Sequence, residues 1–551
     1  MHGIAELSAH NRVTKNDLGL AKQGEDPVFS IRLSGKAAGK TAPSRAAAAT
    51  GMCVALGLLL LATACGGSSS SPFPISGNYS NASLSGQYAF FLSGNQFVVA
   101  SSSLQGYYRE AGVFTADGNG NITAGTDDFN SAGVFGSFSS TPITGKYSIG
   151  KDGNGVIQLN IGGGTETWAI TLVSSSKFYL TEGDAFSNFA ANAAGEGDKQ
   201  DTSALGSKPS GTFAFRVHQT LTTTPDSAIA GVLNTNGAPG EADTISGASL
   251  TTSPFQVSAN FAQLDNAGRG TLVLTVGPTT SNFVYYVVNA NTFFLLESDA
   301  TVLGLGRAEK QSGGPFTASS VSGPYTFGST GDTQANIGGV NTAGTLTVSS
   351  GSISNGAYDS VIDGNPTLNQ AFTGTINNLD AAGRVSVSLT PTGPGNPINE
   401  VWYMVSPTRA FSLVFYPNNV TTTEDGTLDQ TSGSPFSTSS LKGQYAFFMQ
   451  GSTSIGSNLL TRNGTFIPDG NGNLNINETT NLYGGVNNGA VVTSPIYLTG
   501  NTYTMANNGR ALANVANLSS NLVLYMVSPS KAYILQGDSG VLEWGTVELQ
   551  Q

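Results

Sequence analysis

The chain is 551 residues long, carries a formal net charge of −12 and contains 71 glycines, while only 11% of its residues are charged. So few Glu, Lys and Arg side chains argue against long helices and favour strands joined by tight turns. The acidic balance also argues against nucleic acid as a partner, because phosphate backbones would repel such a chain.

The first recognisable element is an apolar run over residues 51–64 that ends immediately before Cys65. It is shorter than the about 20 apolar residues that a membrane-spanning helix needs. Basic residues precede it, and Ala62-Thr63-Ala64 stand just before the cysteine, which is the order of an export signal. Three interpretations remain open: a signal peptide with a lipid-modified Cys65, an ordinary cleaved signal peptide, and an uncleaved anchor.

This segment resembles the signal peptide and lipobox of bacterial lipoproteins, although Ala62 takes the place where leucine is commonest. The resemblance implies that 1–64 are a signal peptide with an extended or misassigned leader, that Cys65 is lipidated, and that 65–82 form a Gly/Ser/Pro tether. It implies a lipid anchor in the bacterial cell envelope, at the outer membrane or cell surface. Cys53 lies inside the signal and the chain has only two cysteines, so the exported part has none left for a disulfide.

Downstream, a strand-opening motif occurs four times, each time with a glycine followed two residues later by Tyr or Phe. The glycines are Gly86, Gly211, Gly323 and Gly443, and an apolar hairpin begins late in each copy, at 168–173, 283–288, 401–405 and 523–527. Two motifs in the same order in every copy indicate tandem domains, because the period is too long for a solenoid. The Pro/Gly-rich junctions place these domains at 83–203, 204–314, 315–436 and 437–551.

In the first copy, alternation of apolar and polar residues predicts eight strands. They lie near 87–93, 107–116, 121–129, 142–150, 154–161, 166–173 and 177–183, with a last one before Gln200. Short turns between consecutive strands favour an all-β fold of antiparallel meander domains, which we expect to be small eight-stranded up-and-down barrels. β-sandwiches are the alternative. The opening Gly-x-Tyr/Phe is similar to the Gly-x-Trp start of lipocalin-like barrels.

Two Asp-Gly-Asn-Gly-Asn segments raise a calcium hypothesis. Their side-chain oxygens stand at the alternate positions of an EF-hand-type loop, on Asp117, Asn119, Asn121, Asp469, Asn471 and Asn473. The glycine expected at the sixth position is replaced by Ile122 or Leu474, and the second and third copies lack the segment. Asp-Gly and Asn-Gly are also preferred in two-residue hairpin turns. We therefore expect hairpin turns and no metal site, with calcium as the alternative.

Catalytic motifs are weak in this chain. A protease-like Gly-Asp-Ser-Gly at 537–540 and the Ser-x-x-Lys segments that begin at Ser174 and Ser528 all fall in turns of the repeat. Of the three histidines only His218 follows the signal segment, which excludes ordinary zinc sites and Ser-His or Cys-His catalysis. We expect no enzyme, no catalytic residue and no cofactor.

Two further groups of residues suggest a specific function, one in glycoside hydrolysis and one in ligand binding. Paired carboxylates could act on glycosides, with Asp127, Asp128 and Glu478 as candidates, but surface carboxylates are common in an acidic protein. Strand aromatics could fill the core or line a cavity for an apolar or sugar-like ligand; they are Tyr88, Phe90, Tyr285, Trp402, Tyr403 and Tyr525. We expect them to be core.

The sequence thus predicts a cell-envelope-anchored lipoprotein whose tandem β domains form a non-catalytic surface binding or structural module. The alternative is a lipocalin-like carrier of a small apolar or sugar-like ligand. The expected partners are the membrane, through the lipid on Cys65, and a small ligand or an extracellular polymer. The oligomeric state stays open, as does the question of whether the repeats act independently.

Overall fold

The computed structural model describes residues 77–551, except for 99–102, 132–136, 183–188, 222–225, 248, 251–252, 334–337, 394, 418–421, 454–457, 484–490, 493–495 and 517–519. The signal segment and Cys65 lie outside the described residues. Within them, the elements are strands and short 3-10 turns, the latter at Asn81–Ser83, Thr202–Ala204, Ala318–Ser320 and Thr438–Ser440. No helix in this part of the chain is long and apolar enough to span a membrane.

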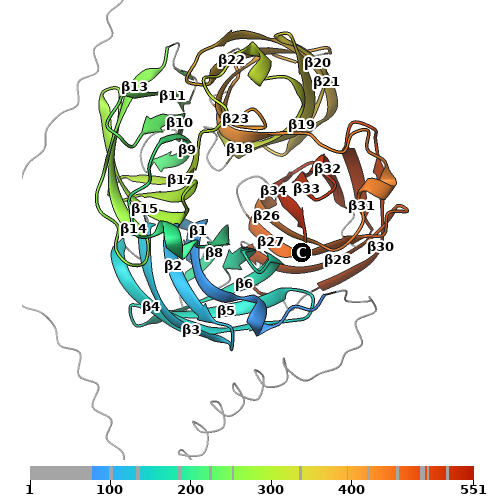
Figure 1. Ribbon diagram of the computed structural model, residues 1–551. Coiled ribbons are helices and arrows are strands. Elements are labelled where there is room, and N and C mark those ends of the chain that lie inside the picture. The colour runs from blue at the N-terminus through green and yellow to red at the C-terminus, as the bar shows by residue number, and fades with distance from the viewer. Residues whose placement is uncertain are drawn as a thin grey trace, which may run out of the picture. The chain divides into compact units, whose positions relative to one another are not determined.

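The strands close into four eight-stranded antiparallel barrels that follow one another along the chain (Figure 1). The first barrel comprises β1 (Ser85–Val98), β2 (Ser103–Asp117), β3 (Asn121–Ser131), β4 (Phe138–Ile149), β5 (Asn154–Ile161), β6 (Gly164–Ser174), β7 (Lys177–Glu182) and β8 (Phe189–Lys199). The second comprises β9 (Thr212–Leu221), β10 (Ser227–Asn234), β11 (Gly240–Ser246), β13 (Phe255–Phe261), β14 (Arg269–Val276), β15 (Thr279–Asn289), β16 (Thr292–Glu297) and β17 (Val302–Lys310), with the two-residue β12 (Ser249–Leu250) beside β11.

The third and fourth barrels repeat this order. The third comprises β18 (Gly323–Thr333), β19 (Gly338–Ser349), β20 (Ser352–Ile362), β21 (Asn365–Leu379), β22 (Arg384–Pro391), β23 (Ile398–Ser406), β24 (Arg409–Phe415) and β25 (Thr422–Gln430). The fourth comprises β26 (Tyr445–Thr453), β27 (Asn458–Pro468), β28 (Asn473–Tyr483), β30 (Ile496–Met505), β31 (Arg510–Val515), β32 (Ser520–Ser528), β33 (Lys531–Gln536) and β34 (Val541–Leu549), with β29 (Val491–Val492) beside β28.

The predicted up-and-down barrel is confirmed, and the sandwich alternative does not apply. All eight strands expected in the first copy are present in the expected order, with ends that differ by a few residues. In each barrel the first strand pairs with the last; in the first barrel, for example, Tyr88 of β1 lies opposite Lys199 of β8. Closure removes the exposed sheet edges that an open meander would leave.

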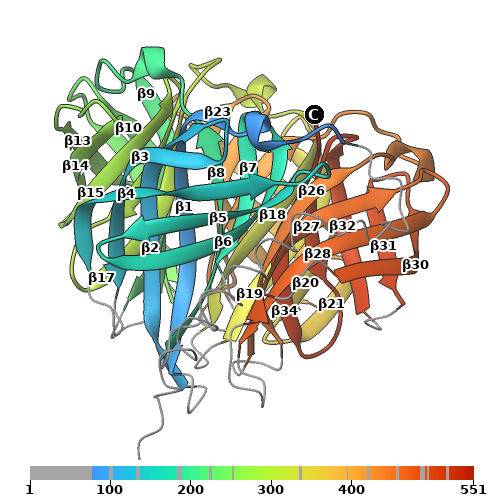
Figure 2. The ribbon, with the colours of Figure 1, turned by 90° about the horizontal axis from the view of Figure 1, so that it is seen from below.

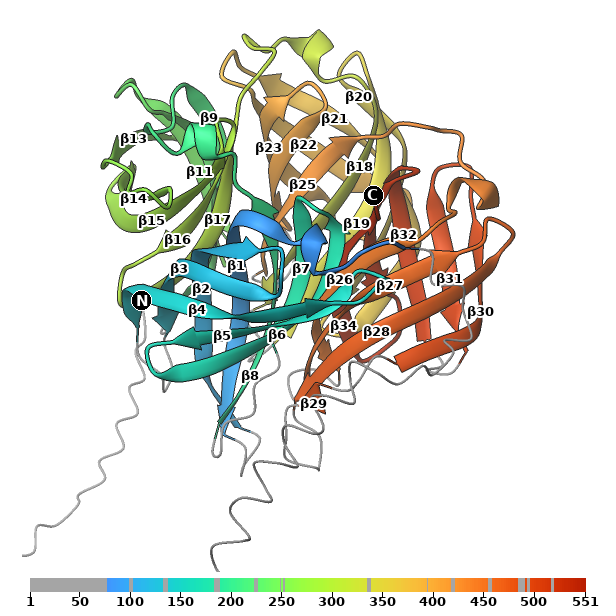
Figure 3. The same ribbon diagram turned by 60° about the horizontal axis from the view of Figure 1, so that its bottom comes forward.

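Alternation along the strands sets the inside and the outside of each barrel. On β5, Ile157 and Leu159 point inward and are fully buried, whereas Val156, on the opposite face of the strand, is 43% exposed. β4 and β5 form the side of the first barrel that faces away from the other three barrels (Figures 2 and 3). Because side chains alternate with a period of two, this pattern also fixes the register of the strands.

The glycine of the opening motif has a backbone reason to recur. Gly86, Gly211, Gly323 and Gly443 have φ of 111°, 121°, 98° and 126°, a region that L side chains rarely adopt. The Tyr or Phe two residues later then points into the barrel, where Tyr88 and Phe213 are fully buried. The motif therefore marks the turn into the first strand of each barrel.

Each barrel packs against the next, and the fourth packs against the first (Figure 1). One backbone hydrogen bond is repeated at all four contacts, from the second residue after the last strand of one barrel to a valine carbonyl of the neighbour. The four bonds are Asp201 N to Val288 O at 2.8 Å, Ser312 N to Val405 O at 2.9 Å, Ser432 N to Val527 O at 2.8 Å and Gln551 N to Val173 O at 2.9 Å. The tandem repeats therefore form a closed cycle of contacts.

The apolar hairpins of the sequence lie at these contacts. On β15, every residue from 283 to 288 is buried, so both faces of the strand are covered. Phe283 and Tyr285 point into the second barrel, while Tyr286 packs on the outside of the first. A strand that is apolar on both faces indicates burial on both faces, and here the neighbouring barrel supplies the second cover.

Candidate functional site

The two calcium candidate segments form hairpin turns, between β2 and β3 and between β27 and β28. In the first, Asp117 Oδ1 accepts hydrogen bonds from the backbone N of Asn119 at 2.7 Å and of Asn121 at 3.0 Å, and Oδ2 accepts one from Asn121 Nδ2 at 2.7 Å. The second repeats these three bonds around Asp469, with donors from Asn471 and Asn473. Hydrogen bonds from the Asn473 side chain and from backbone N–H groups lower the pKa of Asp469 to about 2. Both carboxylates thus serve to hold their turns.

Two of the three candidate carboxylates, Asp127 and Asp128, are neighbours on β3 and lie on opposite faces of that strand. Asp127 points into the first barrel and is fully buried, whereas its neighbour Asp128 points outward and binds Arg269 of the second barrel. Glu478 lies inside the fourth barrel, 3.8 Å from Arg462. The three candidates therefore do not gather in one cleft.

The interior of the first barrel holds a cluster of three carboxyl groups, Glu110 on β2, Asp127 on β3 and Glu166 on β6. Burial raises the pKa of Glu110 well above its usual value, and the charges of Asp127 and Glu166 raise it further. Burial and the charge of Glu166 likewise raise the pKa of Asp127. Above the usual carboxyl pKa, the folded protein therefore keeps protons on this cluster that the unfolded chain has released.

We expect Asp127→Asn to stabilise the protein at pH 8 by about 1 to 3 kcal/mol, because it removes an unsatisfied buried acid. Since the folded-state pKa of Asp127 is raised, wild-type stability should fall as pH rises from the unfolded pKa towards the folded one. The gain should therefore shrink at pH 5, as urea unfolding at both pH values would measure. The control is Asp299→Asn, at a carboxylate bound to Asn282 in an exposed turn. An equal gain at both pH values would contradict the argument.

The six candidate aromatic residues divide into two groups. Tyr88, Phe90, Tyr285 and Trp402 fill barrel interiors, as expected for core. Tyr403 and Tyr525 instead point out of their barrels, and each donates its hydroxyl to an aspartate of the preceding barrel. Both are fully buried, but at a contact between barrels and not in a barrel interior.

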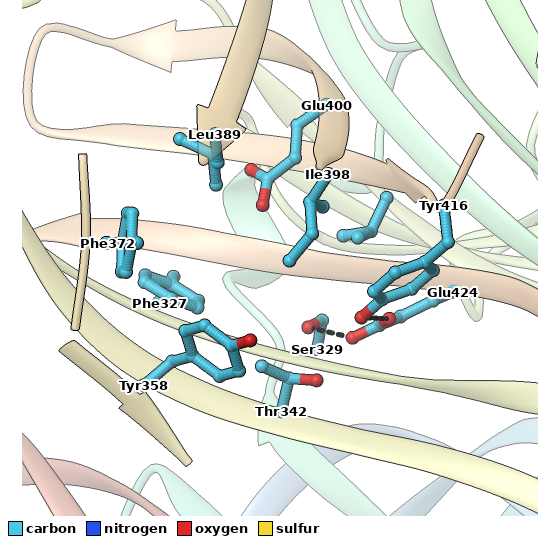
Figure 4. A pocket seen from close by; sticks show the side chains of 11 residues that line it. Phe327, Ser329, Thr342, Tyr358, Phe372, Leu389, Ile398, Glu400, Tyr416 and Glu424 are labelled. Atoms are coloured by element: carbon cyan, nitrogen blue, oxygen red, sulfur yellow. Dashed lines mark hydrogen bonds between the residues drawn. The ribbon is translucent and has the colours of Figure 1, made fainter. Parts of the chain in front are cut away.

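A small cavity lies inside the third barrel, between aromatic and acidic side chains (Figure 4). Its volume is about 10 Å³, which is room for about one water molecule. Glu424 accepts hydrogen bonds from Ser329 at 2.5 Å and from Tyr416 at 2.8 Å, and Glu400 accepts one from the Trp402 indole at 2.5 Å. Burial raises the pKa of Glu400 to about 7. The described walls leave no room for a ligand of lipocalin size.

The most strongly organised polar groups lie between the barrels. At three of the four contacts, an aspartate on the third strand of one barrel is held by an arginine and a tyrosine of the next. At the second contact, Arg384 Nε and Nη2 lie 2.5 and 2.8 Å from the two oxygens of Asp243, and Tyr403 donates to Asp243 at 2.6 Å. The other two sets are Asp128 with Arg269 and Tyr286, and Asp359 with Arg510 and Tyr525.

The contact that closes the cycle has different chemistry. Asn477 of β28 takes the position of the aspartate and donates from Nδ2 to Asp152 Oδ2 at 2.9 Å. In the first barrel, Asn154 takes the position of the arginine and Thr171 that of the tyrosine. Thr171 donates a hydrogen bond to Asn154. At this position the closing contact thus has an amide–carboxylate hydrogen bond, where the other three contacts have an aspartate–arginine ion pair.

A second set of charged side chains links all four barrels; we call it the ion circuit. Its members alternate in sign and are Lys177, Glu196, Arg307, Glu309, Arg409, Asp429, Lys531 and Glu548. The bonds that cross between barrels are Glu196–Arg307 at 2.7 Å, Glu309–Arg409 at 2.7 Å, Asp429–Lys531 at 2.6 Å and Glu548–Lys177 at 2.8 Å. Burial acts to raise the pKa of Glu309, but the charges of Arg409 and Arg307 outweigh it and lower it to about 2.

The ion circuit is kept intact by a compensating change in the second repeat. Lys177, Arg409 and Lys531 start the seventh strand of their barrels, but the second barrel has Thr292 at this position. The missing cation is supplied by Arg307 on the adjacent strand β17, which binds Glu309 at 3.1 Å. A different residue thus restores the alternation of charge.

The fold and its contacts define an all-β protein of four closed barrels joined in a cycle. No family model matches the sequence, and no curated protein matches it. Among solved structures, a double mutant of transferrin binding protein B from Haemophilus parasuis is 10% identical over 68% of this chain and 83% of its own, with a TM-score of 0.17. The iron transporter FrpB from Neisseria meningitidis is 8% identical over 85% of this chain and 83% of its own, with a TM-score of 0.14. At such TM-scores the likeness carries no argument about function.

Proposed function

We propose that this chain is a lipoprotein, anchored through Cys65, whose four barrels act as one non-catalytic scaffold in the bacterial cell envelope. The ion circuit carries the part of the proposal that concerns the scaffold, because four ion pairs join the barrels in a cycle. A cycle of this kind resists the relative movement of its members, which suits a module that presents a fixed surface to an extracellular polymer or protein. The anchor is argued from the lipobox-like sequence alone.

The carrier alternative has less support. The interiors hold large side chains, with Trp168 in the first barrel and Trp402 in the third almost fully buried. The cavity described in the third barrel is of the size of about one water. A carrier would need an interior several hundred Å³ larger.

Native mass spectrometry of the Cys65→Ser chain, purified without added ligand, tests the scaffold against the carrier. We expect the mass of the polypeptide alone. A reproducible extra mass that is lost on denaturation would contradict the scaffold and identify the class of ligand.

Cys65→Ser should move the protein from the membrane fraction to the soluble fraction and abolish labelling by a palmitate analogue. The matched control is Cys53→Ser, which changes the other cysteine and keeps the lipobox-like segment. Labelling that survives in Cys65→Ser, or disappears in Cys53→Ser, would overturn the proposed anchor. The reason is that only a cysteine thiol at the cleavage point can receive the lipid.

A further inference from the structure

His218 lies on the outer face of β9, at the contact between the second and third barrels. Its neighbours Val217 and Gln219 are buried on the other side of the strand, so the imidazole faces away from the interior of its own barrel. Three carboxylates surround it: Asp226 just before β10, Asp332 on β18 and Asp425 on β25. The last two belong to the third repeat.

The two nitrogens of His218 have different surroundings. Nδ1 lies 2.7 Å from Asp425 Oδ1, and Arg216 pairs with the other oxygen of the same carboxylate. Asp425, which also pairs with Arg216, accepts from Nδ1, so Nε2 is the nitrogen that can bind an ion, in exchange for the proton that it shares with Asp332. A carboxylate that orients a histidine in this way is typical of metal ligands.

Nε2 is directed at the two remaining carboxylates. It lies 2.9 Å from Asp332 Oδ2 and 3.9 Å from Asp226 Oδ2. One nitrogen and two oxygens of this group lie within 4.8 Å of one another. The side chains of Asp332, His218 and Asp226 are 46%, 21% and 15% exposed, so an ion can reach them from solvent.

The local charge also favours a cation. Arg216 compensates Asp425. The fixed charge that faces Asp226 and Asp332 is Arg109 of the first barrel, whose guanidinium is bonded to Thr220 Oγ1 at 2.7 Å. Asp226 and Asp332 thus place two carboxylates beside one guanidinium.

We propose that His218, Asp226 and Asp332 bind a divalent cation of the first transition series and thereby clamp the second barrel to the third. Ordinary zinc sites use several His or Cys ligands, and for that reason a chain with a single exported histidine does not predict one. Here two carboxylates complete the set, and one of them comes from the next repeat. Imidazole nitrogen together with carboxylate oxygen suits Zn²⁺ or Mn²⁺ better than Ca²⁺, which prefers six to eight oxygen ligands.

Isothermal titration of the chelator-treated full chain with Zn²⁺, Mn²⁺ and Ca²⁺ tests the site. We expect one high-affinity Zn²⁺ or Mn²⁺ per chain, and a rise in Tm when the metal is present. His218→Gln and Asp332→Asn should each weaken binding by about ten-fold or more, while Asp538→Asn, in the turn between β33 and β34 of the fourth barrel, should leave it unchanged. Circular dichroism checks that each variant is folded. Asp332→Asn should disturb the packing less than His218→Gln, because the Asp332 side chain is the more exposed of the two.

Three outcomes would overturn the proposal. They are no stoichiometric binding of any of these ions, binding that survives both substitutions, and selective binding of Ca²⁺. If the wild type binds no metal and His218→Gln changes only the pH dependence of Tm, the group is a proton-linked contact between the barrels and not a metal site.

Discussion

Asp243→Ala is expected to lower the free energy of unfolding by about 3 to 5 kcal/mol, because it leaves a buried arginine without its partner. The Arg384 side chain is 8% exposed and that of Asp243 is fully buried, which makes this pair the most enclosed of the three aspartate–arginine pairs. Tyr403 would lose its acceptor at the same time. Urea unfolding at pH 7, followed by circular dichroism, measures the change.

The closing contact offers a matched control for this experiment. Asn477→Ala removes the equivalent side chain where the partner is Asp152 and no arginine is present, so we expect a loss of only about 1 kcal/mol. The double variant Asp243→Leu/Arg384→Met should recover most of the stability lost in Asp243→Ala, because it leaves no unpaired charge. Equal losses for Asp243→Ala and Asn477→Ala would show that burial of charge is not the cause.

Trp402→Ala is expected to cost about 3 to 5 kcal/mol, since it opens a cavity in a packed core. Trp402 is 1% exposed inside the third barrel, and its indole donates to the buried Glu400. Trp402→Phe should cost less, because it keeps most of the volume and loses mainly the hydrogen bond. Trp544→Ala, at a partly buried residue that stacks on Tyr533, is the control for loss of an indole outside a barrel core.

The destabilisation by Trp402→Ala also tests whether the four barrels unfold together, because its effect on each barrel can be measured separately. If the four barrels unfold as one unit, Trp402→Ala should speed amide hydrogen exchange in the slowest strands of all four barrels. The contacts that transmit the effect are the aspartate–arginine pairs and the ion circuit on either side of the third barrel. Faster exchange confined to the third barrel would mean that the barrels unfold independently, and would count against a single scaffold.

Much of each barrel follows from its own stretch of sequence. Strands such as β5 are recognisable because alternation and turn residues act between neighbours in the chain, where Asn154 and Gly155 follow a turn and Ile157 and Leu159 point inward. The recurring Gly86 and its equivalents mark the start of each repeat, because a positive φ is needed there. Fold class, strand order and repeat number therefore required no tertiary information.

The contacts between barrels carried a signal in the sequence that alternation did not explain. The runs at 283–288 and 523–527 are apolar at every position, which indicates cover on both faces. Arg269, Arg384 and Arg510 each follow a glycine in the same turn of the repeat, and a tyrosine recurs in the next strand. Together these residues mark one face of each barrel, although they do not identify what covers it.

The sequence by itself determined four all-β repeats of eight strands, because the forces that select strands and turns act over a few residues. Only the tertiary structure decided which side chains meet, since Asp243 and Arg384 are 141 residues apart and Lys177 and Glu548 are 371 apart. The local sequence around each of these charged residues predicts a solvent-exposed side chain. They become buried partners because the last barrel returns to the first, and this closure depends on the geometry of all four repeats together.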